Sequence, residues 1–281
     1  DFADYDAATT YAASTNGSPI KVIYEHAIWE SAQGANTGNT PTTGNDTWWV
    51  KLLATNRWSA FDGYIQNQST RSESCNWVVT PTSITTAVSL FNILGGSVTI
   101  TMTDPIEGVV YDKTFSLVDN SNIIDAYAYW FDPIITKNNL CVTDLPPYAN
   151  APISVTVTAT GGVAAVGQLT FGYPEIFGET QSDVPLGIDD FTILNEDEFG
   201  RTFPVIRGYV NESTPAVVLD SFRVQYLKRK LADQRGIPTV YAFDTIYADN
   251  ELIYLGFYSS MNFIYSSEEK STLELEIRSL V

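Results

Sequence analysis

The residues best suited to nucleophilic or metal chemistry are few. The chain has one histidine, His26, and two cysteines, Cys75 and Cys141. Serine and cysteine nucleophiles that depend on an imidazole base would both have to use His26. It falls in a predicted strand within residues 20–30 with no signature nucleophile nearby, so we predict a structural or surface role. One histidine and two distant cysteines do not make a tetrahedral zinc site. Two cysteines cannot form a disulfide scaffold, and we favour two buried thiols over one bridge.

Carboxylates are the other groups that could do acid–base chemistry. The visible clusters are Asp189-Asp190 and Glu196-Asp197-Glu198. Neighbours along a strand point to opposite faces, which argues against Asp189 and Asp190 acting as a glycosidase pair. We interpret these acids as solvated turn residues or a weak calcium site. No phosphate-binding loop or strand-linked dinucleotide motif is present either. We therefore assign no catalytic residues and no metal ligands, and we predict no cofactor and no enzyme activity.

Aromatic residues gather near the N-terminus, and flat rings could stack on the apolar faces of sugars. The set is Tyr24, Trp29, Trp48, Trp49 and Trp58. The alternative is that these rings are simply the core of a small module with little else to bury. Adjacent strand residues face opposite sides, so one of Trp48 and Trp49 can be core while the other is exposed or meets the next domain. We favour core and interdomain packing over ligand binding.

Basic residues cluster late in the chain, nine of the 15 lying after residue 186. Five lie on or beside a predicted helix: Arg223, Lys228, Arg229, Lys230 and Arg235. They form either a contact strip for an acidic partner subunit or the hydrated face of an amphipathic helix, and the hydrated face is the commoner case. Three of them, Arg223, Lys228 and Arg229, are kept as candidate subunit contacts.

Net charge and hydropathy limit the partners of the whole chain. A formal charge of −18 repels nucleic acid and anionic lipid, so we expect neither as a partner. No apolar run approaches the roughly 20 residues that a membrane-spanning helix needs, and we expect no membrane insertion. Tyr, Phe, Trp, Val, Ile and Thr are plentiful, a balance that favours strands.

Periodicity and turn residues divide the chain into three parts that would position these side chains. Residues 1–57 predict a small three-stranded module, with strands in 20–30 and at 48–52. Residues 58–180 alternate apolar and polar, notably at 97–103 and 153–159, and predict a jelly-roll-like β-sandwich. Residues 186–281 predict an α+β domain with one helix on a sheet. The fold class is mainly β.

The C-terminal part carries the clearest local signals. A turn at residues 197–200 should join two strands, and a helix should run from about Ser221 to Arg235. Asp220 or Ser221 can cap its start, while Gly236 and Pro238 stop it. One face of this helix carries its apolar residues, namely Val224, Leu227 and Leu231.

Six segments of the chain have a familiar combination of residues: 35–41 (ANTGNTP), 48–50 (WWV), 55–63 (TNRWSAFDG), 101–104 (TMTD), 145–149 (LPPYA) and 197–202 (DEFGRT). Together they resemble a family of tailed-bacteriophage structural proteins of the tail tip or baseplate. These proteins often begin with a module like the small chitin-binding carbohydrate-binding modules. The chain departs from the family at Leu53-Ala54, where a Gly-Pro-like corner is expected. This departure bears on the angle between module and body.

The resemblance implies a virion tail component, present in several copies and in contact with copies of itself and other tail proteins, without enzymatic turnover. The N-terminal module could contact a host-surface glycan through Trp29, Trp48 and Trp49, which occupy its aromatic positions, or could survive only as a docking piece. The alternatives are a secreted or virion-attached glycan-binding lectin and an accessory protein of a polysaccharide depolymerase.

Overall fold

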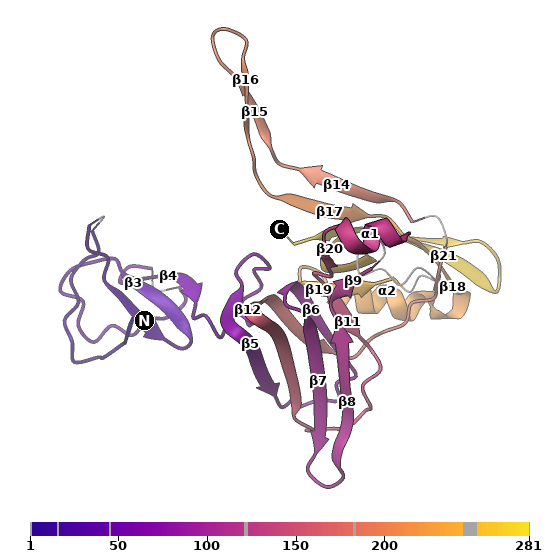
Figure 1. Ribbon diagram of the computed structural model, residues 1–281, viewed down its shortest axis with the longest axis horizontal. Helices are drawn as coiled ribbons and strands as arrows, with labels where there is room; N and C mark the ends of the chain where they lie inside the picture. The colour runs from indigo at the N-terminus through magenta and orange to yellow at the C-terminus, as the bar shows by residue number, and fades with distance from the viewer. Residues whose placement is uncertain are drawn as a thin grey trace.

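A computed structural model describes residues 2–15, 17–44, 46–120, 123–181, 184–243 and 252–280. The chain is mainly β, as predicted, with three sheeted parts and one long hairpin that extends away from them (Figure 1). No helix in the described residues is long and apolar enough to cross a membrane.

The N-terminal module is a four-stranded sheet in the order β1-β2-β3-β4. The three predicted strands are β2 (Lys21–Tyr24), β3 (Ala27–Ser31) and β4 (Trp49–Ala54). A two-residue strand, β1 (Ala3–Asp4), pairs in parallel with β2. It is too short to leave any alternation in the sequence, so periodicity could not reveal it.

The central body is one curled sheet of six strands rather than two separate sheets. Its strands are β5 (Ser69–Val79), β6 (Ala87–Leu94), β7 (Ser97–Asp104), β8 (Gly108–Ser116), β11 (Leu140–Val142) and β12 (Ile153–Gly172). The predicted alternating segment 153–159 is the first part of β12, which continues to Gly172. Along one edge the first half of β12 pairs with β7 and the second half with β6, while β5 follows the other edge as far as Val166.

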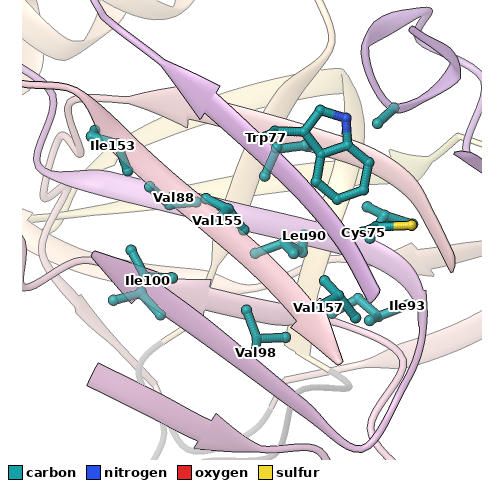
Figure 2. Packing of buried hydrophobic residues seen from close by; sticks show 14 of the residues in the cluster. Cys75, Trp77, Val88, Leu90, Ile93, Val98, Ile100, Ile153, Val155 and Val157 are labelled. Carbon is teal, nitrogen blue, oxygen red and sulfur yellow. The ribbon is translucent and has the colours of Figure 1, made fainter. Parts of the chain in front are cut away.

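This exchange of partners closes the central core. The register shifts between Thr158 and Val163, where β12 changes its neighbour from β7 to β6. Alternate residues of the strands then point inward, and Figure 2 shows Val88 and Leu90 of β6 beside Val155 of β12, whose cross-strand partner in β7 is Ile100. The predicted jelly-roll-like sandwich therefore has its two layers, but they belong to one continuous sheet. Alternation specifies which side chains face a core, not where a strand bends.

A short excursion leaves the central body between β8 and β11. It contains the two-residue strands β9 (Val118–Asp119) and β10 (Ile135–Thr136), which pair with each other, and the helix α1 (Ala126–Phe131) between them. The sequence did not predict α1. Six residues give less than two turns of periodicity, and the side chain of Asp125 caps the helix by accepting a hydrogen bond from the Ala128 amide at 2.7 Å.

The C-terminal domain is a seven-stranded sheet covered by one ten-residue helix, as predicted. Its strands are β13 (Glu179–Thr180), β14 (Leu186–Asp190), β17 (Tyr209–Ser213), β18 (Ala216–Asp220), β19 (Thr239–Ala242), β20 (Ile253–Tyr265) and β21 (Lys270–Ser279). The helix is α2 (Val224–Asp233), whose Val224, Leu227 and Leu231 are buried against the sheet. Strand β13 pairs with β18, so this sheet reaches back before the predicted domain start at residue 186.

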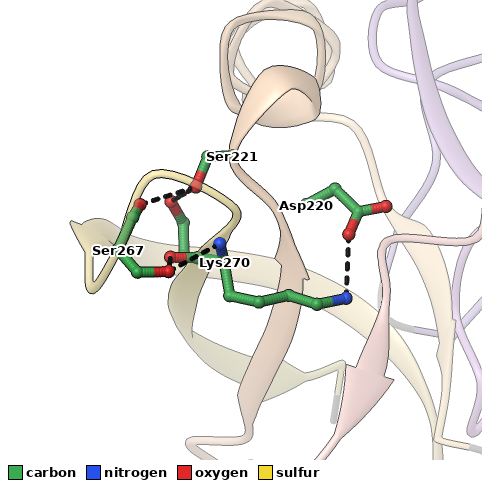
Figure 3. Close-up of polar contacts among 5 residues, drawn as sticks. Asp220, Ser221, Ser267 and Lys270 are labelled. Carbon is green, nitrogen blue, oxygen red and sulfur yellow. Dashed lines mark hydrogen bonds and ion pairs between the residues drawn. The ribbon is translucent and has the colours of Figure 1, made fainter.

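The start of α2 is not capped as predicted. A 3-10 turn, η2 (Ser221–Arg223), precedes it, and neither Asp220 nor Ser221 makes a side-chain capping bond. Instead the Asp220 carboxylate accepts a hydrogen bond from Lys270 Nζ at 2.8 Å, and Ser221 Oγ lies 2.7 Å from Ser271 Oγ (Figure 3). Residues in the loop before β21 and at the start of that strand therefore bind both side chains. These partners are distant in sequence, so the sequence of the helix alone does not reveal them.

Candidate functional site

The predicted glycan-binding tryptophans are mostly internal. Trp49 is fully buried and Trp29 is 4% exposed, while Trp48 is half-buried. Trp49 Nε1 donates to the Asn39 carbonyl at 2.7 Å, and its ring meets Tyr5 and Tyr11 edge to face. Two of the three candidates therefore have no face free to stack on a sugar, because they form the core of a module with little else to bury.

Trp58 and His26 form the contact between the module and the body. Glu25 and His26 occupy the turn between β2 and β3 with φ of 45° and 64°, so His26 lies in a turn and not in the predicted strand. Its ring stacks on Trp58 with centroids 4.0 Å apart, and its carbonyl accepts the Thr55 amide at 2.8 Å. The single histidine is thus committed to a structural contact beside the 3-10 turn η1 (Ser59–Phe61) that begins the body.

Both cysteines are free thiols, as predicted, but only Cys75 is fully buried and Cys141 is partly exposed. Cys75 lies in the central core, and burial raises the pKa of its thiol. Burial also raises the pKa of the Cys141 thiol, whose sulfur accepts a hydrogen bond from Ser89. A raised pKa leaves less thiolate, the nucleophilic form, so neither group is activated.

The predicted acidic clusters are used locally. Asp189 pairs with Arg278, which also contacts Glu212 at 2.7 Å. Asp197 accepts the amides of Phe199 and Arg201 at 2.9 and 2.8 Å, which closes the predicted turn. Within the described ranges no three His, Cys, Asp or Glu side chains converge as metal ligands. Asp189 therefore serves as an ion-pair partner and Asp197 as a turn cap.

One polar cluster on the central body escaped the sequence analysis. Tyr111 is buried and donates to Asp144 at 2.7 Å, and Lys113 also pairs with that carboxylate. Lys113 and the Tyr111 hydroxyl hold the pKa of Asp144 below its usual value. Burial, with Asp144 beside it, raises the pKa of Tyr111. Tyr111 is in β8 and Asp144 follows β11, at opposite ends of the strand order, so the curl of the sheet brings the two side chains together.

The most unusual surface is a long hairpin arm, residues 186–213. Strands β14 and β17 form its base in the C-terminal sheet, and β15 (Ile193–Glu196) and β16 (Thr202–Val205) carry it away from the body (Figure 1). Every described residue of β15 and β16 is exposed. Ten large apolar side chains along it are open to solvent: Leu186, Ile188, Phe191, Ile193, Leu194, Phe199, Phe203, Val205, Ile206 and Tyr209.

A second apolar surface lies on α1. Tyr127, Tyr129, Trp130 and Phe131 are 65–75% exposed, and Ala128 alone in this helix is buried. Soluble monomers rarely keep contiguous apolar patches of this kind, which usually mark contacts with other molecules.

One of the three basic candidate contact residues is bound within the chain, and the other two are exposed. Arg223 pairs with Glu175 at 3.1 Å and donates to the Ile176 carbonyl at 2.8 Å, so it is engaged within the chain. Lys228 and Arg229 are exposed and make no ion pair within the described ranges. They border a groove of about 550 Å³ between α2 and β20. Its other lining residues are Val224, Gln225, Met261, Asn262, Phe263 and Tyr265.

Comparison of the chain with protein-family models, with curated proteins and with solved structures finds no match.

Proposed function

We propose that this chain is a structural component of a bacteriophage tail, at the tail tip or baseplate, that assembles with copies of itself and with other tail proteins. The arm is the observation that carries the proposal. An isolated two-stranded hairpin is marginally stable in water. An arm that exposes apolar side chains along its whole length gains its missing stabilisation when another chain covers it.

The second apolar surface supports the same reading. Four exposed aromatic rings on α1 lie outside all three hydrophobic cores. An adhesive or mechanical part needs such surfaces, whereas a freely diffusing protein is penalised for them by non-specific association. The role of a virion component comes from the sequence resemblance, and the arm supplies a physical means of assembly.

Glycan binding by the N-terminal module is the less supported alternative. Burial of Trp29 and Trp49 leaves Trp48 as the one candidate ring with a partly open face. The depolymerase alternative needs facing carboxylates in a cleft. The groove beside α2 has none among its described lining residues, whereas a second hollow is lined by Asp220, Glu268 and Glu269, of which Asp220 is paired with Lys270.

The proposal is tested on particles. Antibodies raised against the full chain should label one end of the tails of virions purified from the source that encodes it, with a matched pre-immune serum as control. The proposal fails if purified particles contain no copy of the chain, or if the chain occurs free as a small species that binds a glycan array.

A further inference from the structure

We propose that the tip of the arm of one copy docks in the groove beside α2 of a second copy. The tip is residues 196–201. This inference rests on the proposed assembly function and names the partner of its arm.

The tip joins an apolar side chain to free negative charge. Phe199 is 84% exposed in the loop, and Gly200 takes φ of 77° to close it. The carboxylate of Asp197 is used by two loop amides, but Glu196 and Glu198 are exposed and make no ion pair or hydrogen bond recorded for the described residues. The loop therefore presents one exposed aromatic ring next to two uncommitted carboxylates that precede it in the chain, and the exposed Arg201 offsets one of the three negative charges of the tip.

The groove has the complementary composition. Its apolar lining includes the half-buried Met261 and Phe263, and Lys228 and Arg229 supply positive charge at its edge. Among the described residues no acidic side chain lines it, although Asn262 of the lining donates to the exposed Glu274 carboxylate at 3.5 Å. In a chain of net charge −18, a groove lined by two cations and by no described acid complements the acidic tip.

The two surfaces cannot meet within one copy. Figure 1 shows the arm leaving the body and its tip lying away from α2. Arg278 of β21 fixes the base of the arm through Asp189 and Glu212, which holds this direction. The tip complements the groove but cannot reach the groove of its own copy. We therefore infer that a second copy supplies the tip that occupies it.

Such a contact is head-to-tail, because one copy offers the tip and the other offers the groove. After one contact the copy that donates its tip still has a free groove, and the copy that receives it still has a free tip, so the contact repeats to give a closed ring or an open filament. Repetition of this kind is what several copies around a tail axis would require.

Charge reversal on each side gives the test. The full chain should form assemblies whose size rises with concentration in mass photometry or sedimentation velocity. The tip variant Glu196→Lys/Glu198→Lys and the groove variant Lys228→Glu/Arg229→Glu should each weaken self-association by roughly 100-fold, because like charges then face each other. Mixing the two variants should restore assembly, since each tip then meets a groove of opposite charge.

Controls separate this contact from a general charge effect. Lys230 is exposed on the same helix, lies over the Tyr226 ring and does not line the groove, so Lys230→Glu should assemble like the parent chain. Thermal melting should be equal for all variants, because the changed side chains are exposed. Assembly should also weaken as salt rises.

The inference is overturned if the parent chain stays monomeric at every concentration, or if the variants assemble as it does, or if mixing fails to restore assembly. Assembly that is lost in the tip variant alone would mean that another surface receives the tip, and this also overturns the inference. None of these results tests whether the chain is a virion component. Antibody labelling of particles tests that separately.

Discussion

The central sheet and the arm are built from similar residues, yet the apolar side chains are buried in the sheet and exposed on the arm. Strand β7 alternates strictly, and its Val98, Ile100 and Met102 are completely buried. Strands β15 and β16 of the arm carry Ile193, Leu194 and Phe203 with every residue exposed. The central sheet curls on itself through β12 and satisfies its own apolar faces, whereas the hairpin has no second layer. The comparison teaches that strand sequence alone does not make a core, because a core needs a facing layer.

Matched truncations should give the largest difference between these regions. Ile100→Ala removes a fully buried side chain and should lower the free energy of unfolding by about 2–5 kcal/mol through lost burial and a residual cavity. Leu194→Ala, at a side chain 67% exposed on the arm, should change it by less than about 0.5 kcal/mol in the monomer. Urea unfolding measures both. Equal losses would mean that the arm is packed on the body in solution.

A smaller effect should follow from releasing the base of the arm. Arg278→Gln removes the ion pairs with Asp189 and Glu212, whose side chains are about 40% exposed. Surface pairs of this kind contribute about 0.2–1 kcal/mol, so global stability should fall by no more than about that amount. Amide hydrogen exchange should speed up in residues 186–213 and stay unchanged in β7. Faster exchange in both regions would show that the arm and the central sheet unfold together.

The smallest effect concerns pH at the edge of the central sheet. Because Lys113 and Tyr111 lower the pKa of Asp144, the stabilisation from this carboxylate is present above its unfolded value of about 3.9 and is lost as pH falls through the lower folded value. The Asp144 and Lys113 side chains are about half exposed, so the contribution should stay below about 1 kcal/mol.

Asp144→Asn keeps an acceptor for Tyr111 and is the matched control. The stability difference between the parent chain and this variant, measured by urea unfolding, should shrink as pH falls below about 4. A difference that does not change with pH would show that the charge of Asp144 does not stabilise the fold.

Local signals predicted local structure well. The apolar spacing of Val224, Leu227 and Leu231 predicted the face that α2 buries, and the turn at residues 197–200 joins β15 to β16 with a hydrogen bond from the Gly200 amide to the Asp197 carbonyl. The predicted cap at Asp220 or Ser221 was wrong, because residues some 50 positions later bind both side chains. The helix α1 was missed, since six residues are too few to show a period.

The candidate site was harder to predict than the fold. The sequence favoured core packing for the tryptophans without deciding which rings stay open, and it named Arg223 alongside Lys228 and Arg229 as a contact. Burial of Trp49 follows from the Tyr5 and Tyr11 rings packed on it, and engagement of Arg223 follows from Glu175, 48 residues away. Neither partner is near enough in sequence to be paired by inspection.

The sequence by itself determined that this protein is mainly β with one covering helix, because periodicity and turn residues act over a few neighbouring positions. Only the tertiary structure decided that residues 153–172 form one strand shared by two layers, and that the apolar strands of the arm face water. Both outcomes depend on which distant strand lies opposite, and that pairing is fixed by the burial of whole faces and not by any residue's own preference.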